Sequence, residues 1–176
     1  MRAGAVFLIF GLFADVYGAS LEDLIEALNT TQTIWLYNQS YQDSPDAPNR
    51  TCVSWHLRNI DKSLYTFDND YKDGREYYTD YNTNATLSET KNNAEMNVTY
   101  IREAQSPTSV LYKLNKWDSN DKCFVLTFSN GVSGNVNCEL HVWQDKLNDD
   151  HTSCDKVYQD LCKEKGREVF SAHDCM

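Results

Sequence analysis

The chain has 176 residues, with 26 acidic and 16 basic side chains and a formal net charge of −10. An acidic surface repels the phosphates of nucleic acids and of anionic lipid headgroups, so neither a nucleic acid nor a membrane surface is an expected partner. Once a leader segment is removed, a chain of this length fits a single domain.

The N-terminal segment has the pattern of a secretory signal peptide. A basic Arg2 is followed by an apolar run, Ala5 to Ala14, and then by small residues. That run is too short to cross a bilayer core of about 30 Å as a helix. We therefore expect residues 1–18 to be a signal peptide and residues 19–176 to form one secreted, extracellular domain.

The cysteines and the glycosylation motifs both fit a secreted protein. An even number of cysteines in an oxidising compartment predicts disulfides. No CxxC or HxxxH spacing occurs, so we expect no metal site and no cofactor. The six cysteines are Cys52, Cys123, Cys138, Cys154, Cys162 and Cys175. The five N-x-S/T sequons, candidate N-glycosylation sites, are at Asn29, Asn38, Asn49, Asn84 and Asn97.

From Thr33 onward, short segments rich in β-branched and aromatic residues are separated by turn residues, such as Asp73-Gly74 and Asn130-Gly131. The segments are TIWLY, TCVSWHLRNI, SLYTF, REYYTDYN, MNVTYI, SVLYKLN, CFVLTF and CELHVW. Eight such strands in sequence predict an antiparallel meander. Closure into an eight-stranded barrel leaves this sheet without free edges.

A helix is expected at each end of the strand region. Ser20 is a capping residue for LEDLIEAL, whose apolar residues share one helical face. After the last strand, Ser153 is a candidate N-cap and Gly166 a candidate stop for a C-terminal α-helix packed outside the barrel. The predicted fold is therefore mainly β, with a short N-terminal helix and one C-terminal helix.

Strand alternation assigns the side chains to two faces. If the strand cysteines face outward to meet elements outside the barrel, the opposite faces form its interior. The predicted interior residues are Val53, Trp55, Leu57, Phe124, Leu126, Phe128, Glu139, His141 and Trp143. An eight-stranded barrel can be filled by such side chains or can hold one small ligand, and both alternatives stay open at this point.

No nucleophile, metalloprotease, phosphate-loop or paired-carboxylate motif occurs, so we expect a binding protein rather than an enzyme. Three of the four histidines, His56, His151 and His173, are expected in contact with solvent. His141 is the one histidine expected to face the interior.

The order of TCV, DSNDKCFVL, CELHVW and TSCDKVYQDLC, with a last cysteine beside the C-terminus, resembles the tick salivary lipocalins of the histamine-binding family. The resemblance covers about residues 41–175. It implies a lipocalin-type barrel that sequesters host mediators and thereby modulates the host immune and inflammatory response. It also implies three bridges: Cys52 to Cys175, Cys123 to Cys154, and the remaining pair Cys138 to Cys162.

The resemblance carries over only part of the family's amine site. Glu139 corresponds to the carboxylate that holds an amine. Tyr41 and Asp43 fall near the family's Tyr and Asp before TCV, and Tyr100 falls near one of its pocket aromatics.

Three positions depart from the family's amine signature. Phe124 stands where the family has Asp, and His141 stands where it has Trp. The carboxylate expected ahead of DSNDKC falls at Lys113 or Leu114. A buried ammonium with a single carboxylate partner loses more in desolvation than it regains.

These departures favour a small hydrophobic ligand with one polar group, a sterol such as cholesterol or an eicosanoid, over an amine. We expect this ligand carrier to be a monomer and to act on the host immune response, with dendritic cells as a target. The alternatives are a scavenger of histamine or serotonin, and a protein-binding immunomodulator that uses the barrel as a scaffold for a host protein. The predicted ligand-binding residues are Tyr41, Asp43, Trp55, Leu57, Tyr100, Phe124, Leu126, Phe128, Glu139, His141 and Trp143.

Overall fold

The computed structural model describes residues 18–42, 49–91, 93–102, 106–129, 136–162 and 166–176. The predicted signal peptide, apart from its last residue, and the predicted turn at Asn130-Gly131 lie outside these ranges. The elements in chain order are α1 (Leu21–Leu28), β1 (Ile34–Gln39), β2 (Thr51–Ile60), β3 (Leu64–Asp73), β4 (Glu76–Thr90), β5 (Asn93–Tyr100), β6 (Thr108–Asp118), β7 (Cys123–Ser129), β8 (Val136–Trp143), a 3-10 turn (Gln144–Lys146), α2 (Thr152–Leu161), β9 (Arg167–Glu168) and α3 (Ala172–Cys175).

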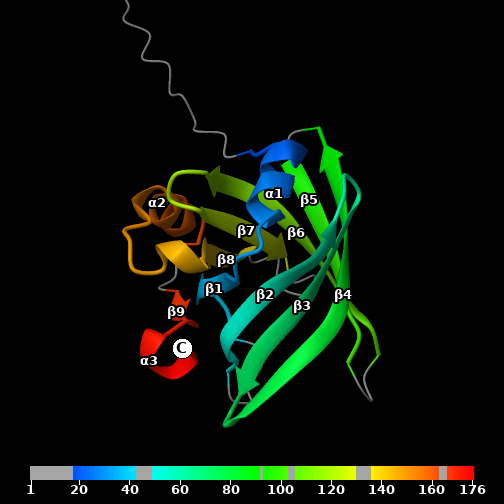
Figure 1. The fold of residues 1–176 in the computed structure, drawn as a ribbon. Helices are drawn as coiled ribbons and strands as arrows, with labels where there is room; N and C mark the ends of the chain where they lie inside the picture. Colours follow the sequence, from blue (N-terminus) through cyan, green and yellow to red (C-terminus); the bar gives the residue numbers. More distant parts are fainter. Residues whose placement is uncertain (1–17, 43–48, 92, 103–105, 130–135, 163–165) are drawn as a thin grey trace, which may run out of the picture.

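Strands β1 to β8 form a closed antiparallel barrel, which confirms the predicted fold class. Consecutive strands from β2 to β8 pair with one another, and β1 lies between β8 and β2 and closes the sheet. The two-residue β9 adds to β1, where Asn38 pairs with Glu168. Figure 1 shows α1 at one end of the barrel, with α2, β9 and α3 outside the wall.

The N-terminal helix closes one end of the barrel. The Ser20 hydroxyl accepts the Asp23 amide at 3.1 Å, while the Asp23 carboxylate accepts the Ser20 amide at 2.8 Å, so the first turn is capped from both sides. Leu24 and Leu28 are fully buried. The indole N–H of Trp143 donates to the Ala27 carbonyl at 3.0 Å and ties β8 to the helix.

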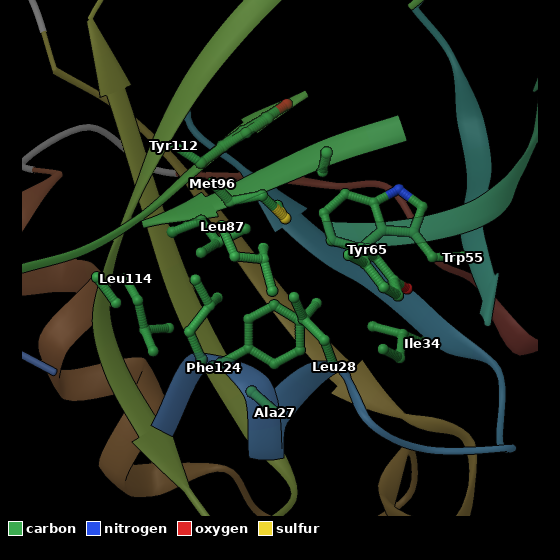
Figure 2. Packing of buried hydrophobic residues seen from close by; sticks show 14 of the residues in the cluster. Ala27, Leu28, Ile34, Trp55, Tyr65, Leu87, Met96, Tyr112, Leu114 and Phe124 are labelled. Carbon is green, nitrogen blue, oxygen red and sulfur yellow. The ribbon is translucent and has the colours of Figure 1, made fainter. Parts of the chain in front are cut away.

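Behind the helix, the closed half of the barrel is a packed core. Figure 2 shows Ala27 and Leu28 of α1 beside Phe124, with Leu87 and Met96 in the same cluster. The leucine, phenylalanine and methionine side chains of this cluster are almost completely removed from water, and burial of each stabilises the fold by roughly 1.5 to 3 kcal/mol relative to exposure.

Three disulfides fasten the barrel to the elements outside it. Cys123 of β7 bonds to Cys154 of α2, Cys138 of β8 bonds to Cys162, and Cys52 of β2 bonds to Cys175 at the end of α3. These are the pairs that the resemblance implies. The strand cysteines face outward, toward a second apolar cluster that includes Val125, Leu140 and Val157.

Two expectations about the strands and helices were wrong at their boundaries. Strand β4 runs from Glu76 to Thr90, well past the predicted REYYTDYN segment. Its inward residues there are Thr83, Ala85 and Leu87, and the small or polar members of that series hide the alternation. The helix α2 ends at Leu161 rather than near Gly166.

The predicted start of α2 was also wrong. Ser153 lies inside the helix, where its hydroxyl donates to Asp118 at 2.8 Å. The N-cap is His151, which is 3% exposed and whose Nε2 lies 2.7 Å from the Lys146 carbonyl. His151 is therefore a buried structural residue and not the solvated histidine that its polar neighbours in sequence suggested.

Candidate functional site

A cavity of about 350 Å³ occupies the end of the barrel away from α1. Its lining comes from the end of β1, the start of β2, the ends of β3 and β5, the start of β6 and the inward residues of β7 and β8. The lining residues are Leu36, Gln39, Tyr41, Gln42, Arg50, Val53, Trp55, Asn69, Tyr71, Asp73, Tyr100, Arg102, Thr108, Val110, Tyr112, Phe128, Glu139 and His141. The volume lies within the range of small-molecule sites, roughly 300 to 1,000 Å³.

A buried carboxylate stands in the wall of the cavity. Glu139 of β8 is 2% exposed. Its Oε1 accepts the hydroxyls of Tyr41 at 2.5 Å and Tyr112 at 3.3 Å, and its Oε2 lies 2.9 Å from Nε2 of His141. Three donors therefore stabilise this carboxylate, which has about four acceptor positions.

The tyrosines around Glu139 are held in their protonated form. Burial, followed by the nearby Glu139 carboxylate, raises the pKa of Tyr112 well above its usual value. The same two causes, in the same order, raise the pKa of Tyr100. Both hydroxyls therefore remain hydrogen-bond donors at physiological pH, and they place polar hydrogens among the aromatic rings that line the cavity.

His141 is sandwiched between two rings. It stacks on Phe124 with ring centroids 4.9 Å apart and an angle of 6°, and Trp55 lies 4.4 Å away on a tilted plane. Because a carboxylate only accepts hydrogen bonds, Nε2 must carry the proton that faces Glu139. Nδ1 is buried and has no hydrogen-bond partner among the described residues, so it is a polar position that a ligand can use.

Two arginines lie at the mouth of the cavity, Arg50 just before β2 and Arg102 just after β5. The guanidinium carbon of Arg50 lies 4.3 Å from the centre of the Tyr71 ring, and that of Arg102 lies 5.5 Å from the same centre. Arg102 Nε also lies 3.1 Å from Asp80, a contact that uses one edge of the guanidinium. Arginine presents five N–H donors in a planar fork, the geometry that matches a carboxylate.

A polar chain joins the mouth to the aromatic wall. The Trp55 indole donates to Asn69 Oδ1 at 3.1 Å, and Asn69 Nδ2 donates to Asp80 at 3.1 Å. Asp80 in turn holds Arg102. Hydrogen bonds through Asn69 and Asp80 therefore connect Trp55 in the cavity with Arg102 at the rim.

Comparison with known proteins identifies the family. The model of the tick histamine-binding protein family matches residues 16–176. The chain belongs to this family. Membership in a family of binding proteins agrees with the expectation that the chain is a ligand-binding protein rather than an enzyme. No curated protein sequence matched the chain.

Among solved structures, the chain is similar to japanin from Rhipicephalus appendiculatus bound to cholesterol. The TM-score is 0.55 at 15% sequence identity, and the match covers 82% of this chain and 97% of japanin. At this identity the likeness shows the shared barrel fold alone.

Two departures from the family's amine signature contact each other in this structure. Phe124 and His141, which replace the expected Asp and Trp, are the two rings that stack. An apolar ring and an imidazole thus occupy the positions where the resemblance places a second carboxylate and an indole. The cavity retains one buried carboxylate, and His141 is already bound to it.

The structure divides the predicted ligand-binding residues into two groups. Those that line the cavity are Tyr41, Trp55, Tyr100, Phe128, Glu139 and His141. Leu57, Phe124, Leu126 and Trp143 do not line it; they belong to the packed core or rest against it. They face inward as predicted, but α1 and its neighbours fill their half of the barrel. Asp43 lies outside the described residues.

Sequence reasoning missed several lining residues. Tyr112 could have been found, because it alternates with Leu114 on the inward face of β6. Arg50 and Arg102 carried no such signal, since both lie just beyond strand ends where alternation no longer assigns a face.

Metal sites and membrane-spanning helices are both absent from the described residues. No group of three or more His, Cys, Asp or Glu side chains there is arranged to hold a metal ion. Within the same ranges, no helix is long and apolar enough to cross a membrane.

Proposed function

We propose that this protein is a secreted lipocalin that sequesters an acidic, hydroxylated lipid of the eicosanoid class and so lowers its concentration during an inflammatory response. The observation that carries the proposal is the pair of arginines, Arg50 and Arg102, that faces the mouth of an aromatic cavity across Tyr71. The family, the disulfides and the predicted signal peptide support secretion.

The arginines favour a carboxylate head over a neutral one. Hydrogen bonds between a guanidinium and a carboxylate are about twice as strong as bonds between neutral groups. The terminal nitrogens of Arg102 have no hydrogen-bond partner among the described residues, since Asp80 is contacted through Nε. A sterol has no acidic group to occupy these donors, although the cholesterol bound to japanin supports a lipid as the class of ligand.

The body of the cavity favours a hydrocarbon chain. Trp55, Phe128 and Val53 contribute apolar surface between the mouth and the Glu139 network. Burial of such surface contributes about 0.8 kcal/mol for each methylene removed from water. The phenol rings of Tyr41 and Tyr112 pack edge-on against Phe128 at 5.1 and 5.2 Å and complete this lining.

The Glu139 network fits a hydroxyl on the chain. Glu139 retains about one acceptor position, and His141 Nδ1 is a second buried atom without a partner. A ligand hydroxyl, which can both donate and accept, can bind Glu139 or His141 Nδ1 without displacing a tyrosine. An eicosanoid that bears a hydroxyl therefore satisfies both polar ends of the cavity.

The test compares an acid with the matching alcohol. Protein secreted from insect cells is titrated with arachidonic acid and with arachidonyl alcohol, with the quenching of tryptophan fluorescence as the readout. We expect the acid to bind at least about tenfold more tightly, because one charge-assisted hydrogen bond contributes roughly 1.5 to 3 kcal/mol. Arg50→Gln and Arg102→Gln should each remove most of this preference.

The matched control is Arg58→Gln. Arg58 pairs with Asp68 and is 57% exposed, and it does not line the cavity. Its replacement should leave both affinities within about twofold. Equal binding of acid and alcohol by the wild-type protein, or tighter binding of cholesterol than of either, would overturn the acidic-lipid proposal.

A biogenic amine is the second candidate, because one buried carboxylate stands among aromatic rings. Glu139 lies beside Tyr41 and Tyr112, and tyrosine faces attract cations. This candidate expects histamine to bind tightly, Glu139→Gln to weaken it strongly, and Arg102→Gln to leave it unchanged. Histamine binding that is undetectable at millimolar concentration would exclude it.

A further inference from the structure

Strands β6 and β7 of the barrel wall separate from each other toward the open end, and this separation forms a fork in the sheet. The last residue pair between these strands toward the open end is Lys113 with Thr127. Both strands continue past this pair, since β6 begins at Thr108 and β7 ends at Ser129. The hydrogen-bonded ladder therefore stops before either strand does.

Between the fork and the open end of the barrel, β6 and β7 each remain paired with their other neighbouring strand. On β6, the residues from Thr108 to Lys113 pair with β5 along their whole length. On β7, Phe128 pairs with Asn137 of β8, and Ser129 pairs with Val136. The two strands therefore separate from each other while each stays paired on its other side, so the fork is not fraying of strand ends.

A bulge fixes the bottom of the fork. The register shifts between Leu114 and Lys116, which leaves Asn115 as the extra residue of β6. Its side-chain amide donates to the Lys113 carbonyl at 3.0 Å and to the Thr127 hydroxyl at 2.7 Å. Bulges bend the strand that carries them, and this one stands where β6 turns away from β7.

A groove of about 580 Å³ lies in the fork, between β6 and β7. Its lining includes inward side chains, Val110 and Phe128, and side chains from the outer face of the same strands, Leu111 and Thr127. Because successive side chains of a strand point to opposite faces, a space lined by both kinds passes through the wall. Thr108, Val110 and Phe128 also line the cavity, so the two spaces adjoin.

The geometry points to the groove as a binding site for the hydrocarbon tail of a lipid whose polar head lies in the cavity. This inference rests on the proposed function. The cavity alone is near the small end of ligand sites, and the groove extends it to the outer surface. Leu111 and Val136, which are 48% and 53% exposed, line the groove and provide apolar surface for the end of the chain.

The test varies the chain length of the ligand and the size of one side chain that lines the groove. Decanoic and arachidonic acids are titrated into the wild-type protein, into Ser109→Trp and into the control Ser88→Trp. Ser109 lines the groove from the outer face, whereas Ser88 lies on the exposed face of β4 and lines neither space. Aromatic residues are well accepted on exposed strand positions, so both variants are expected to fold.

We expect Ser109→Trp to lower the affinity for arachidonic acid at least about tenfold. Displacement of two methylenes from apolar surroundings is sufficient for that loss. The affinity for decanoic acid should change less than about twofold, since its chain ends within the cavity. Ser88→Trp should change neither. Val136→Asp, at an exposed position on the rim, should reproduce the selective loss even if Ser109→Trp does not fold.

The outcomes separate the two proposals. Failure of both acids to bind the wild-type protein would contradict the proposed function itself. Tight binding of arachidonic acid that neither groove variant alters, or an equal loss for both acids, would show that the tail stays within the barrel and would overturn this inference.

Discussion

Nε2 of His141 lies 2.9 Å from Oε2 of Glu139, and both residues are almost fully buried. Loss of Glu139 leaves His141 Nε2 and the hydroxyls of Tyr41 and Tyr112 without their acceptor, whereas loss of His141 removes one of the three donors to Glu139. Such a loss costs more than replacement of both partners by apolar groups of similar shape.

We therefore expect Glu139→Leu to lower the free energy of unfolding by about 2 to 4 kcal/mol, since it removes the acceptor of His141, Tyr41 and Tyr112. Glu139→Leu combined with His141→Phe should cost less than the sum of the single changes. Urea unfolding with the disulfides intact measures the three values. Glu89→Leu, at an exposed position of β4, is the control and should stay within about 0.5 kcal/mol. Strict additivity would show that the pair does not stabilise the fold as a unit.

The turn between β2 and β3 gives a prediction for acid. The amides of Ser63 and Leu64, followed by the Ser63 hydroxyl, donate to the Asp61 carboxylate and lower its pKa below 3.8. A group whose folded pKa is depressed stabilises the fold above its unfolded pKa and loses that contribution as the pH falls through the folded value. Stability from Asp61 is therefore present at about pH 5 and is lost below about pH 4.

Asp61→Asn should reduce the pH dependence of unfolding between about pH 5 and about pH 2, because an amide accepts the same hydrogen bonds without titrating. Carboxyl NMR titration of the wild-type protein reports the pKa of Asp61 directly. Ser63→Ala, which removes the hydroxyl donor, should move that pKa part of the way back. An Asp61 that titrates at its ordinary value would refute the prediction.

The disulfides should differ in how much they stabilise. Cys52 and Cys175 are 123 residues apart in sequence, whereas Cys138 and Cys162 are 24 apart. In the chain-entropy model a bridge contributes roughly 2 to 4 kcal/mol and more for a longer loop. Replacement of the Cys52 pair by serine should cost about 1.4 kcal/mol more than replacement of the Cys138 pair, as measured by urea unfolding. An equal or reversed order would mean that local contacts outweigh loop length.

The predicted glycosylation sites differ in exposure. Asn84 and Asn97 both lie on the outer face of the β4–β5 pair, where Asn84 is opposite Thr99 and Asn97 is opposite Thr86. Asn49, in contrast, has a buried side-chain oxygen without a partner among the described residues. We expect Asn84 and Asn97 to carry glycans more fully than Asn49 in protein secreted from insect cells. Peptide mapping after enzymatic deglycosylation in heavy water gives the occupancy of each site, and full occupancy of Asn49 would contradict this order.

The faces of the strands could be predicted because their physical cause is local. Alternation places Val53 and Trp55 on one side of β2 and Ser54 on the other, whatever the rest of the chain does. The cysteines indicated which of the two faces points outward, since Cys123 and Cys138 had to face a partner outside the barrel. The same reasoning failed for His151, because its burial depends on a contact with the Lys146 carbonyl that no periodicity predicts.

The candidate site was predictable only where it lies on strands. Glu139 and His141 follow from the alternation of β8, and the resemblance added Tyr41 and Tyr100. The arginines of the mouth did not follow, because Arg50 precedes β2 and Arg102 follows β5. Their approach to Tyr71 depends on how β2, β3 and β5 are staggered around the barrel.

The sequence by itself determined that an inward face of aromatic and aliphatic residues exists and that one carboxylate lies on it. Only the tertiary structure decided which of those residues surround empty space. Phe124 and Phe128 are equivalent in the pattern of β7, yet Phe124 packs in the closed core and Phe128 lines both the cavity and the groove. The physical reason is that α1 fills one end of the barrel while β6 and β7 separate at the other, and neither event is encoded in the residues of β7.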